Sequence, residues 1–178
     1  PDASDGSESA SGDDSMAQEC LPVPGDEIVV LEDDLMLQNS DNMIPAVNAD
    51  AASPELLAGL DAVSAVLTTD DLIQLNKAVD IDRQTSQEAA TQYVAENGIE
   101  SPETGSGSVV IGAANFSENI TVAEIYSAVL ATAGFDTEVR TIGNRETYLP
   151  ALQSGEIQVV PEYAATVTEF LNLSQNGA

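Results

Sequence analysis

The chain has 178 residues, of which 43% are hydrophobic, so it can fold around a core and is not wholly disordered. Thirty-one Asp and Glu residues oppose four Lys and Arg, for a formal net charge of -27. This excludes nucleic acid and anionic membranes as partners, because both need a basic surface. The chain has no histidine, which excludes a histidine base, metal ligand or pH switch.

Cys20 is the only cysteine, so no disulfide can form within the chain. Met16–Glu19 precede it in place of an apolar signal segment, which argues against a lipid-attachment site. No stretch approaches the roughly 18 apolar residues of a membrane span. We expect no signal peptide within this sequence.

Residues 1–26 are rich in Ser, Gly, Asp and Glu and predict a flexible acidic arm. Glu27–Leu31 predicts a buried strand that stops at Glu32–Asp34. Those three acids have the composition of a metal site but not the spacing of a calcium loop, so we interpret them as a solvated strand end. Asn42–Val47 predicts a second strand, and Pro45 restricts it to a sheet edge or an irregular position.

Three helices are predicted next, each with a start signal. Ser53 and Pro54 supply an N-cap and a proline at the first helical position. Thr69 is predicted to cap the second helix, and Thr85 with Glu88 forms a capping box for the third, which ends at Gly98. Apolar residues at helical spacing in the first helix are Leu56, Leu57, Leu60, Val63 and Leu67.

Residues 101–108 predict a linker, and Gly105–Ser108 has the composition of an engineered flexible joint, although a natural linker is also consistent with it. From Val109 onward the pattern is strand, helix, strand, helix, strand and helix with short connections. This order of elements is typical of a parallel sheet covered by helices. Ser117 is predicted to cap the first of these helices, and Tyr93, Tyr126 and Tyr148 lie on apolar helix faces and are predicted core residues.

Two polar turns, Ala113–Asn119 and Glu162–Thr166, follow the first and third of these strands. Ligands of parallel sheets bind beyond the carboxyl ends of the strands, so we expect the functional site there. We find no nucleophile–base pair and no phosphate-binding loop, and therefore expect no catalysis and no cofactor or metal.

Three runs carry a family resemblance: VVIGAANFSEN, AEIYSAVLATAGF and NRETYLPALQSGEIQVVPEYAAT. They resemble the start of the substrate-binding proteins of osmoprotectant ABC transporters, which bind glycine betaine, proline betaine, carnitine or choline. The family patterns are approximately I-G-S-K-x-F-T-E-Q and S-R-E-x-x-L-P-A-L-x-x-G-E-I-D-x-x-P-E-Y-T-G-T. Residues 27–99 resemble the carboxyl end of the same family, so the family order is inverted.

This resemblance implies an α/β fold, a single lobe of a type II periplasmic-binding-protein fold, with a mainly parallel sheet of about five strands flanked by helices. Residues 27–178 would form that lobe from a family carboxyl-terminal portion (27–100), the linker (101–108) and a family amino-terminal portion (109–178). Such a chain is circularly permuted and lacks the second lobe. The competing account is a natural tandem of two binding domains, cut so that the end of one and the beginning of the next remain. The resemblance also implies an extracytoplasmic parent protein that delivers its solute to an ABC permease.

The resemblance implies a cage of aromatic side chains around a quaternary ammonium group, held by cation–π attraction. Tyr163 and Thr166 match the family's Tyr-x-x-Thr, where the tyrosine is a cage wall. Asn119 stands in place of the family's glutamine, and Asn115 lies in the same turn. Asp41 replaces an aromatic residue and could attract a cation by charge.

The family's lysine, which can pair with a ligand carboxylate, is Ala114 here, a departure that favours choline-like cations. The alternative function is an engineered or structural lobe that folds but binds no ligand. An enzyme on a similar lobe is supported by fold analogy alone. An exposed half-cleft would also be an apolar patch able to drive self-association.

Overall fold

The structure is a computed structural model that describes residues 34–35 and 41–176. The predicted acidic arm, the strand at 27–31 and two of the three acids at 32–34 lie outside the described residues. The strands are β1 (Met43–Val47), β2 (Ser108–Ala114), β3 (Asp136–Gly143) and β4 (Val159–Tyr163). The helices are α1 (Pro54–Ser64), α2 (Thr69–Asp80), α3 (Ser86–Asn97), α4 (Ser117–Thr132), α5 (Arg145–Ser154) and α6 (Ala164–Asn176).

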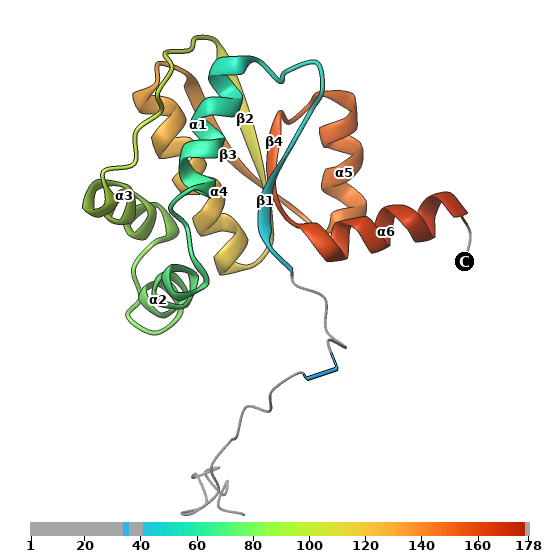
Figure 1. The fold of residues 1–178 in the computed structure, drawn as a ribbon, viewed down its shortest axis with the longest axis horizontal. Helices are drawn as coiled ribbons and strands as arrows, with labels where there is room; N and C mark the ends of the chain where they lie inside the picture. The colour runs from blue at the N-terminus through green and yellow to red at the C-terminus, as the bar shows by residue number, and fades with distance from the viewer. Residues whose placement is uncertain (1–33, 36–40, 177–178) are drawn as a thin grey trace, which may run out of the picture. The chain divides into compact units, whose positions relative to one another are not determined.

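The described strands form one open sheet in the order β1-β4-β2-β3 (Figure 1). β2 runs parallel to both β3 and β4, whereas β1 pairs antiparallel with β4, Met43 lying opposite Tyr163. The expected α/β class, a single lobe of a periplasmic-binding-protein fold, is confirmed. β1 occupies an edge of this sheet, as Pro45 predicted, and the expected fifth strand is the one that falls outside the described residues.

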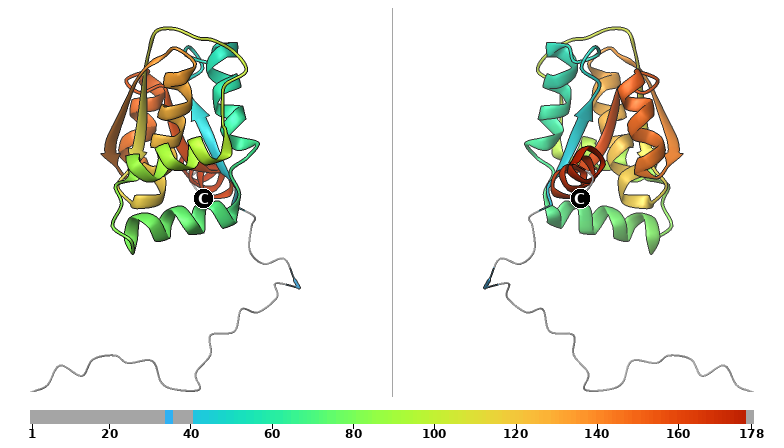
Figure 2. Two further views of the ribbon diagram at one scale, coloured as in Figure 1. Left: turned by 90° about the vertical axis from the view of Figure 1, so that its left-hand side faces the viewer. Right: turned by 90° about the vertical axis from the view of Figure 1, so that its right-hand side faces the viewer.

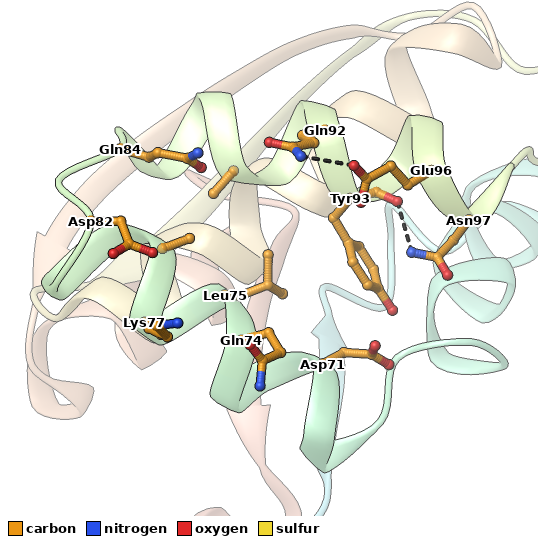
Figure 3. A pocket seen from close by; sticks show the side chains of 12 residues that line it. Asp71, Gln74, Leu75, Lys77, Asp82, Gln84, Gln92, Tyr93, Glu96 and Asn97 are labelled. Atoms are coloured by element: carbon orange, nitrogen blue, oxygen red, sulfur yellow. Dashed lines mark hydrogen bonds between the residues drawn. The ribbon is translucent and has the colours of Figure 1, made fainter.

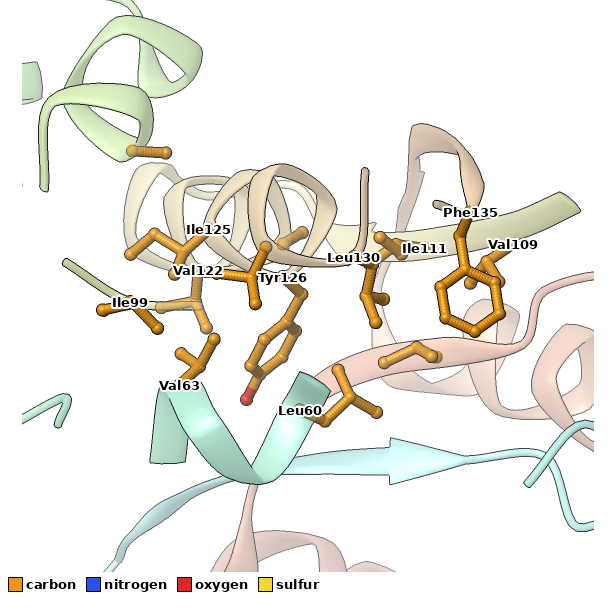
Figure 4. Packing of buried hydrophobic residues seen from close by; sticks show 14 of the residues in the cluster. Leu60, Val63, Ile99, Val109, Ile111, Val122, Ile125, Tyr126, Leu130 and Phe135 are labelled. Atoms are coloured by element: carbon orange, nitrogen blue, oxygen red, sulfur yellow. The ribbon is translucent and has the colours of Figure 1, made fainter. Parts of the chain in front are cut away.

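Side chains along β2 point alternately to the two faces of the sheet, and each face carries its own apolar core. Val109, Ile111 and Ala113 belong to the first core, and Ala114 belongs to the second. The first core is filled chiefly from α1, α3 and α4, whose buried side chains include Leu60, Val63, Val122, Ile125, Tyr126 and Leu130 (Figure 4). The second is filled from α5 and α6 on the opposite face (Figures 1 and 2). Tyr93, Tyr126 and Tyr148 are all buried, which confirms their prediction as core residues.

The helix ends confirm most of the local signals. The Ser53 hydroxyl accepts from the Leu56 N–H, Thr85 and Glu88 form the capping box, and Gly98 ends α3 in the left-handed region at φ 59°. Leu57, in contrast, is 39% exposed, because it sits one residue round the helix from the buried Leu56.

Two predicted caps are wrong. α2 is capped by Thr68, whose side chain and that of Asp71 form a reciprocal capping box, and not by Thr69. The N-cap of α4 is Phe116, with no side-chain cap, so Ser117 is the first helical residue. The Ser117 hydroxyl donates instead to an oxygen of Asp80 in α2, at 3.1 Å.

The segment before β2 packs against the body of the domain. The Gly105 N–H donates to the Ala133 carbonyl at 2.9 Å, and a Cβ at Gly105 would lie 2.0 Å from the Phe135 ring. This position therefore requires glycine for space. In the described part of the chain, every helix is too short or too polar to cross a bilayer.

Candidate functional site

Four chain segments meet at one edge of the sheet, here called the carboxyl edge. The parallel strands β2, β3 and β4 end there at Ala114, Gly143 and Tyr163. β1 runs the other way, so Asp41, just before its amino end, reaches the same edge. This arrangement brings residues from both halves of the chain to the place where a parallel sheet binds its ligands.

Phe116 and Tyr163 form an aromatic pair at this edge, here called the aromatic wall. Their ring centroids are 6.3 Å apart and the ring planes differ by 21°. Phe116 is 45% exposed and Tyr163 is half-buried, so the pair is open to a ligand from outside. Sequence reasoning identified Tyr163 but not Phe116, whose exposure runs against the usual burial of phenylalanine.

The Tyr163 hydroxyl donates a hydrogen bond to one carboxylate oxygen of Glu118 in α4. The side-chain amide of Asn76 in α2 donates to the other oxygen. Burial raises the pKa of Tyr163, and the hydrogen bond to Glu118 and the nearby charges of Asp41 and Glu162 raise it further. Tyr163 therefore stays a neutral donor at ordinary pH.

Asp41 holds the start of α6. One carboxylate oxygen accepts from the Ala165 N–H at 2.8 Å, and the Thr166 hydroxyl donates to the other at 3.1 Å. An acidic side chain at a helix amino terminus satisfies free N–H groups and complements the helix dipole. The structure thus brings the predicted residues Asp41 and Thr166 into direct contact, both of them exposed.

Behind this surface lies a fully buried carboxylate, Glu162. Arg145 donates to both of its oxygens, with a distance of 2.9 Å from Nε to Oε1 and of 2.7 Å from Nη2 to Oε2. The Tyr148 hydroxyl donates to Glu162 at 2.7 Å, and the Tyr163 N–H donates at 3.1 Å. The hydrogen bonds to Glu162 raise the pKa of Arg145, so the guanidinium is permanently charged and committed to this pair.

Asn119, predicted as a ligand donor, lies beneath the site rather than at its surface. It is 1% exposed, its Oδ1 accepts from the Ala114 N–H at 2.7 Å, and its Nδ2 donates to the Pro161 carbonyl at 2.9 Å. Pro161 has no N–H to offer the strand ladder. The Asn119 side chain therefore joins β2 to β4 where their backbone pairing stops.

An open cavity of about 700 Å³ adjoins the aromatic wall. It is lined by Ala114, Asn115, Phe116, Gly143, Asn144, Arg145, Glu146, Thr147, Tyr148 and Phe170. Asn115 is exposed and lines this cavity, and its N–H donates to the Gly143 carbonyl at 3.2 Å.

A second cavity, of about 370 Å³, lies between α2 and α3 (Figure 3). Carboxylates and amides line it, among them Asp71, Asp82 and Glu96, and the Tyr93 side chain points toward Asp71. Tyr93 is only 7% exposed, so its ring presents no open face. Within residues 34–35 and 41–176, no three His, Cys, Asp or Glu side chains are grouped to hold a metal ion.

Sequence reasoning missed four members of this edge: Phe116, Glu118, Arg145 and Glu162. Three of them are charged residues in or just after the turns predicted to follow the strands, where a buried charge needs a partner. That placement is the signal that could have identified them. Their partners come from distant elements, which no local pattern specifies.

The model of the substrate binding domain of ABC-type glycine betaine transport system matches the chain over residues 23–96 and 107–175. The matched residues make up well over half of the chain and include every residue of the carboxyl edge. The interruption falls on 97–106, which contains most of the predicted linker. A search of curated proteins gives no match to the chain.

Proposed function

Because this chain belongs to the family of substrate-binding domains of ABC-type glycine betaine transport systems, we propose that its carboxyl edge binds a quaternary-ammonium solute of the choline type. Members of this family bind substrates outside the cytoplasm for an ABC transporter and are not enzymes. The proposed role of this chain is to provide one side of the binding cleft. The solute would then pass to the permease.

The aromatic wall carries the proposal. A quaternary ammonium cannot donate hydrogen bonds, and it is attracted by the negative faces of aromatic rings. Phe116 and Tyr163 bring two stacked aromatic rings together, with Phe116 at an accessible position. The carboxylates of Glu118 and Asp41 lie next to this wall and add a favourable field for a cation.

The preference for choline over glycine betaine rests on the absence of a free basic group. The whole chain has four basic residues, Lys77, Arg83, Arg140 and Arg145. Only Arg145 lines the cavity, and its guanidinium is already bound to Glu162 through two hydrogen bonds. Ala114 stands where the family carries lysine. A ligand carboxylate would therefore meet Glu118 and Asp41 without a partner, whereas the hydroxyl of choline carries no such cost.

We also propose that the two matched segments form one lobe of a circularly permuted binding protein. In support, β1 from the first segment pairs with β4 from the second, and α1, α2 and α3 pack on α4. The two segments share a single apolar core on that face of the sheet. A permuted lobe and a cut tandem would both produce this arrangement.

Titration calorimetry with choline and with glycine betaine tests the proposed function directly. We expect choline to bind more tightly, and Tyr163→Ala and Phe116→Ala each to weaken choline binding by roughly five-fold to thirty-fold, the range of a lost cation–π contact. Tyr163→Phe retains the ring and should lose less than Tyr163→Ala. Ile73→Ala, an exposed side chain on α2, serves as the control and should leave binding unchanged.

Two results would count against this proposal. Tighter binding of glycine betaine than of choline would remove the assignment to choline-type solutes. No heat with either solute, from a chain shown by circular dichroism to be folded, would favour the alternative that this is a structural lobe without ligand binding.

A further inference from the structure

Glu118 lies next to the aromatic wall, in the first turn of α4, and it receives two hydrogen bonds from side chains. The Tyr163 hydroxyl donates to one oxygen and the Asn76 amide donates to the other. Neutral donors at both oxygens complement the negative charge of a carboxylate. Glu118 therefore places a carboxylate at the hydroxyl end of the Tyr163 ring.

The hydrogen bond to Glu118 controls both the orientation and the electron density of the Tyr163 ring. A charge-assisted hydrogen bond is shorter and stronger than one between neutral groups, so the ring is held at its hydroxyl end. The same bond draws the phenolic proton toward the carboxylate, which polarises the phenol and leaves its π face more negative. A more negative face attracts a cation more strongly and leaves the attraction for a neutral molecule nearly unchanged.

Asn76 fixes Glu118 from the side of α2. Its Nδ2 must face the carboxylate, since the reverse orientation would place two oxygens together. In this orientation the Asn76 Oδ1 is buried with no hydrogen-bond partner among the described residues. Such an unsatisfied acceptor is unusual in a folded protein.

We propose that Glu118, held by Asn76, is the positioning residue that makes Tyr163 selective for cationic over neutral ligands. The inference rests on the proposed function, because it assumes that the aromatic wall binds the solute. It extends the site beyond the surface to a side chain on α2, which comes from the other matched segment of the chain.

The test compares choline with its neutral carbon isostere, 3,3-dimethyl-1-butanol, by calorimetry. Glu118→Gln keeps the size and an acceptor for Tyr163 but removes the charge. We expect it to weaken choline binding by about ten-fold and to change the binding of the neutral isostere by less than about two-fold. Asn76→Ala should weaken choline in the same direction by a smaller factor. Glu124→Gln, on the same helix, is the matched control and should change neither ligand.

A second measurement needs no ligand. Phenolate absorbance of the folded chain follows the ionisation of its tyrosines, and Tyr163 faces the carboxylates of Glu118, Asp41 and Glu162. Glu118→Gln removes one of these charges, so one tyrosine should ionise at lower pH than in the parent chain. In the Tyr163→Phe background the same substitution should produce no such shift.

The outcomes separate the inference from the proposed function. Choline binding that Glu118→Gln leaves intact, or an equal loss for choline and its isostere, overturns the positioning role while the function stands. No binding of choline by the parent chain overturns the function and the selectivity inference together. In that case the phenolate titration still reports whether Glu118 holds Tyr163.

Discussion

Arg145 in α5 and Glu162 in β4 form a two-pronged ion pair, with one nitrogen–oxygen bond of 2.9 Å and another of 2.7 Å. The Glu162 side chain is 1% exposed and that of Arg145 is 22% exposed. Burying the carboxylate is costly, and the guanidinium with the Tyr148 hydroxyl offsets that cost. The pair therefore stabilises the end of β4 and removes the one cation that lines the cavity from ligand binding.

Removing one member of this pair should destabilise the fold strongly. We expect Arg145→Ala to lower the free energy of unfolding by about 3–5 kcal/mol, because it leaves Glu162 charged and buried without its partner. Adding Glu162→Gln to Arg145→Ala should recover part of that loss. Urea denaturation of the two variants measures both effects, and equal stabilities of the single and double variants would contradict the explanation.

Asn119→Ala should lower the free energy of unfolding by about 2–4 kcal/mol, since the Ala114 N–H and the Pro161 carbonyl both lose their partner in a buried site. Asn115→Ala, in the same turn but exposed, is the control and should cost little. Thermal unfolding followed by circular dichroism compares them. A destabilisation no greater than that of the control would show that Asn119 does not join the strands.

The fold should lose stability at alkaline pH through its tyrosines. All four tyrosines of the chain have a raised pKa, that of Tyr93 to about 12 by burial and the charge of Asp71. In the unfolded chain they ionise near pH 10. Their contribution to stability is therefore complete below pH about 10 and is lost as the pH rises through the higher folded-state values.

Phenolate absorbance and urea denaturation, measured together across that range, check this prediction. The chain has no tryptophan, so tyrosine dominates the near-ultraviolet signal. We expect almost no phenolate at pH 10–11 while the chain is folded. A tyrosine that ionises at its ordinary pH without loss of structure would contradict the burial assigned to it.

Gly105→Ala should destabilise the fold by about 1–3 kcal/mol, because the added methyl group has no space beside the Phe135 ring. Ser106→Ala, at the next and exposed position, should have almost no effect. Adding Phe135→Leu to Gly105→Ala should recover part of the loss. A Gly105→Ala variant with the same free energy of unfolding as the parent chain would mean that the linker does not pack where the structure places it.

The order and boundaries of the elements after Asn42 follow closely from local sequence signals. Ser53, Thr85 and Gly98 act through their immediate neighbours, so their effects are visible in the sequence. The true N-cap of α2 could also have been identified from the local sequence. Of Thr68 and Thr69, only Thr68 is followed three residues later by an acid, Asp71. Ser117 differs, because its partner Asp80 comes from another helix.

The predicted site residues Tyr163, Thr166 and Asp41 all lie at the carboxyl edge. The contacts made at this edge were not predictable from the sequence. The pairing of Glu118 with Asn76 spans 42 residues and depends on how α2 and α4 are rotated against each other. The exposure of Phe116 likewise depends on the turn after β2. Such features are set by packing between elements and leave no periodic pattern in the sequence.

The pairing of β1 with β4 means that neither matched segment can complete the domain without the other. α1, α2 and α3 would have no α4 to pack on, and β4 would expose its outer edge. If the backbone were cut between Ser101 and Gly107, the two pieces should reassemble without a covalent link and become a split protein. Its folding would then be bimolecular, so its melting temperature should rise with concentration, and each half would report the presence of its complement.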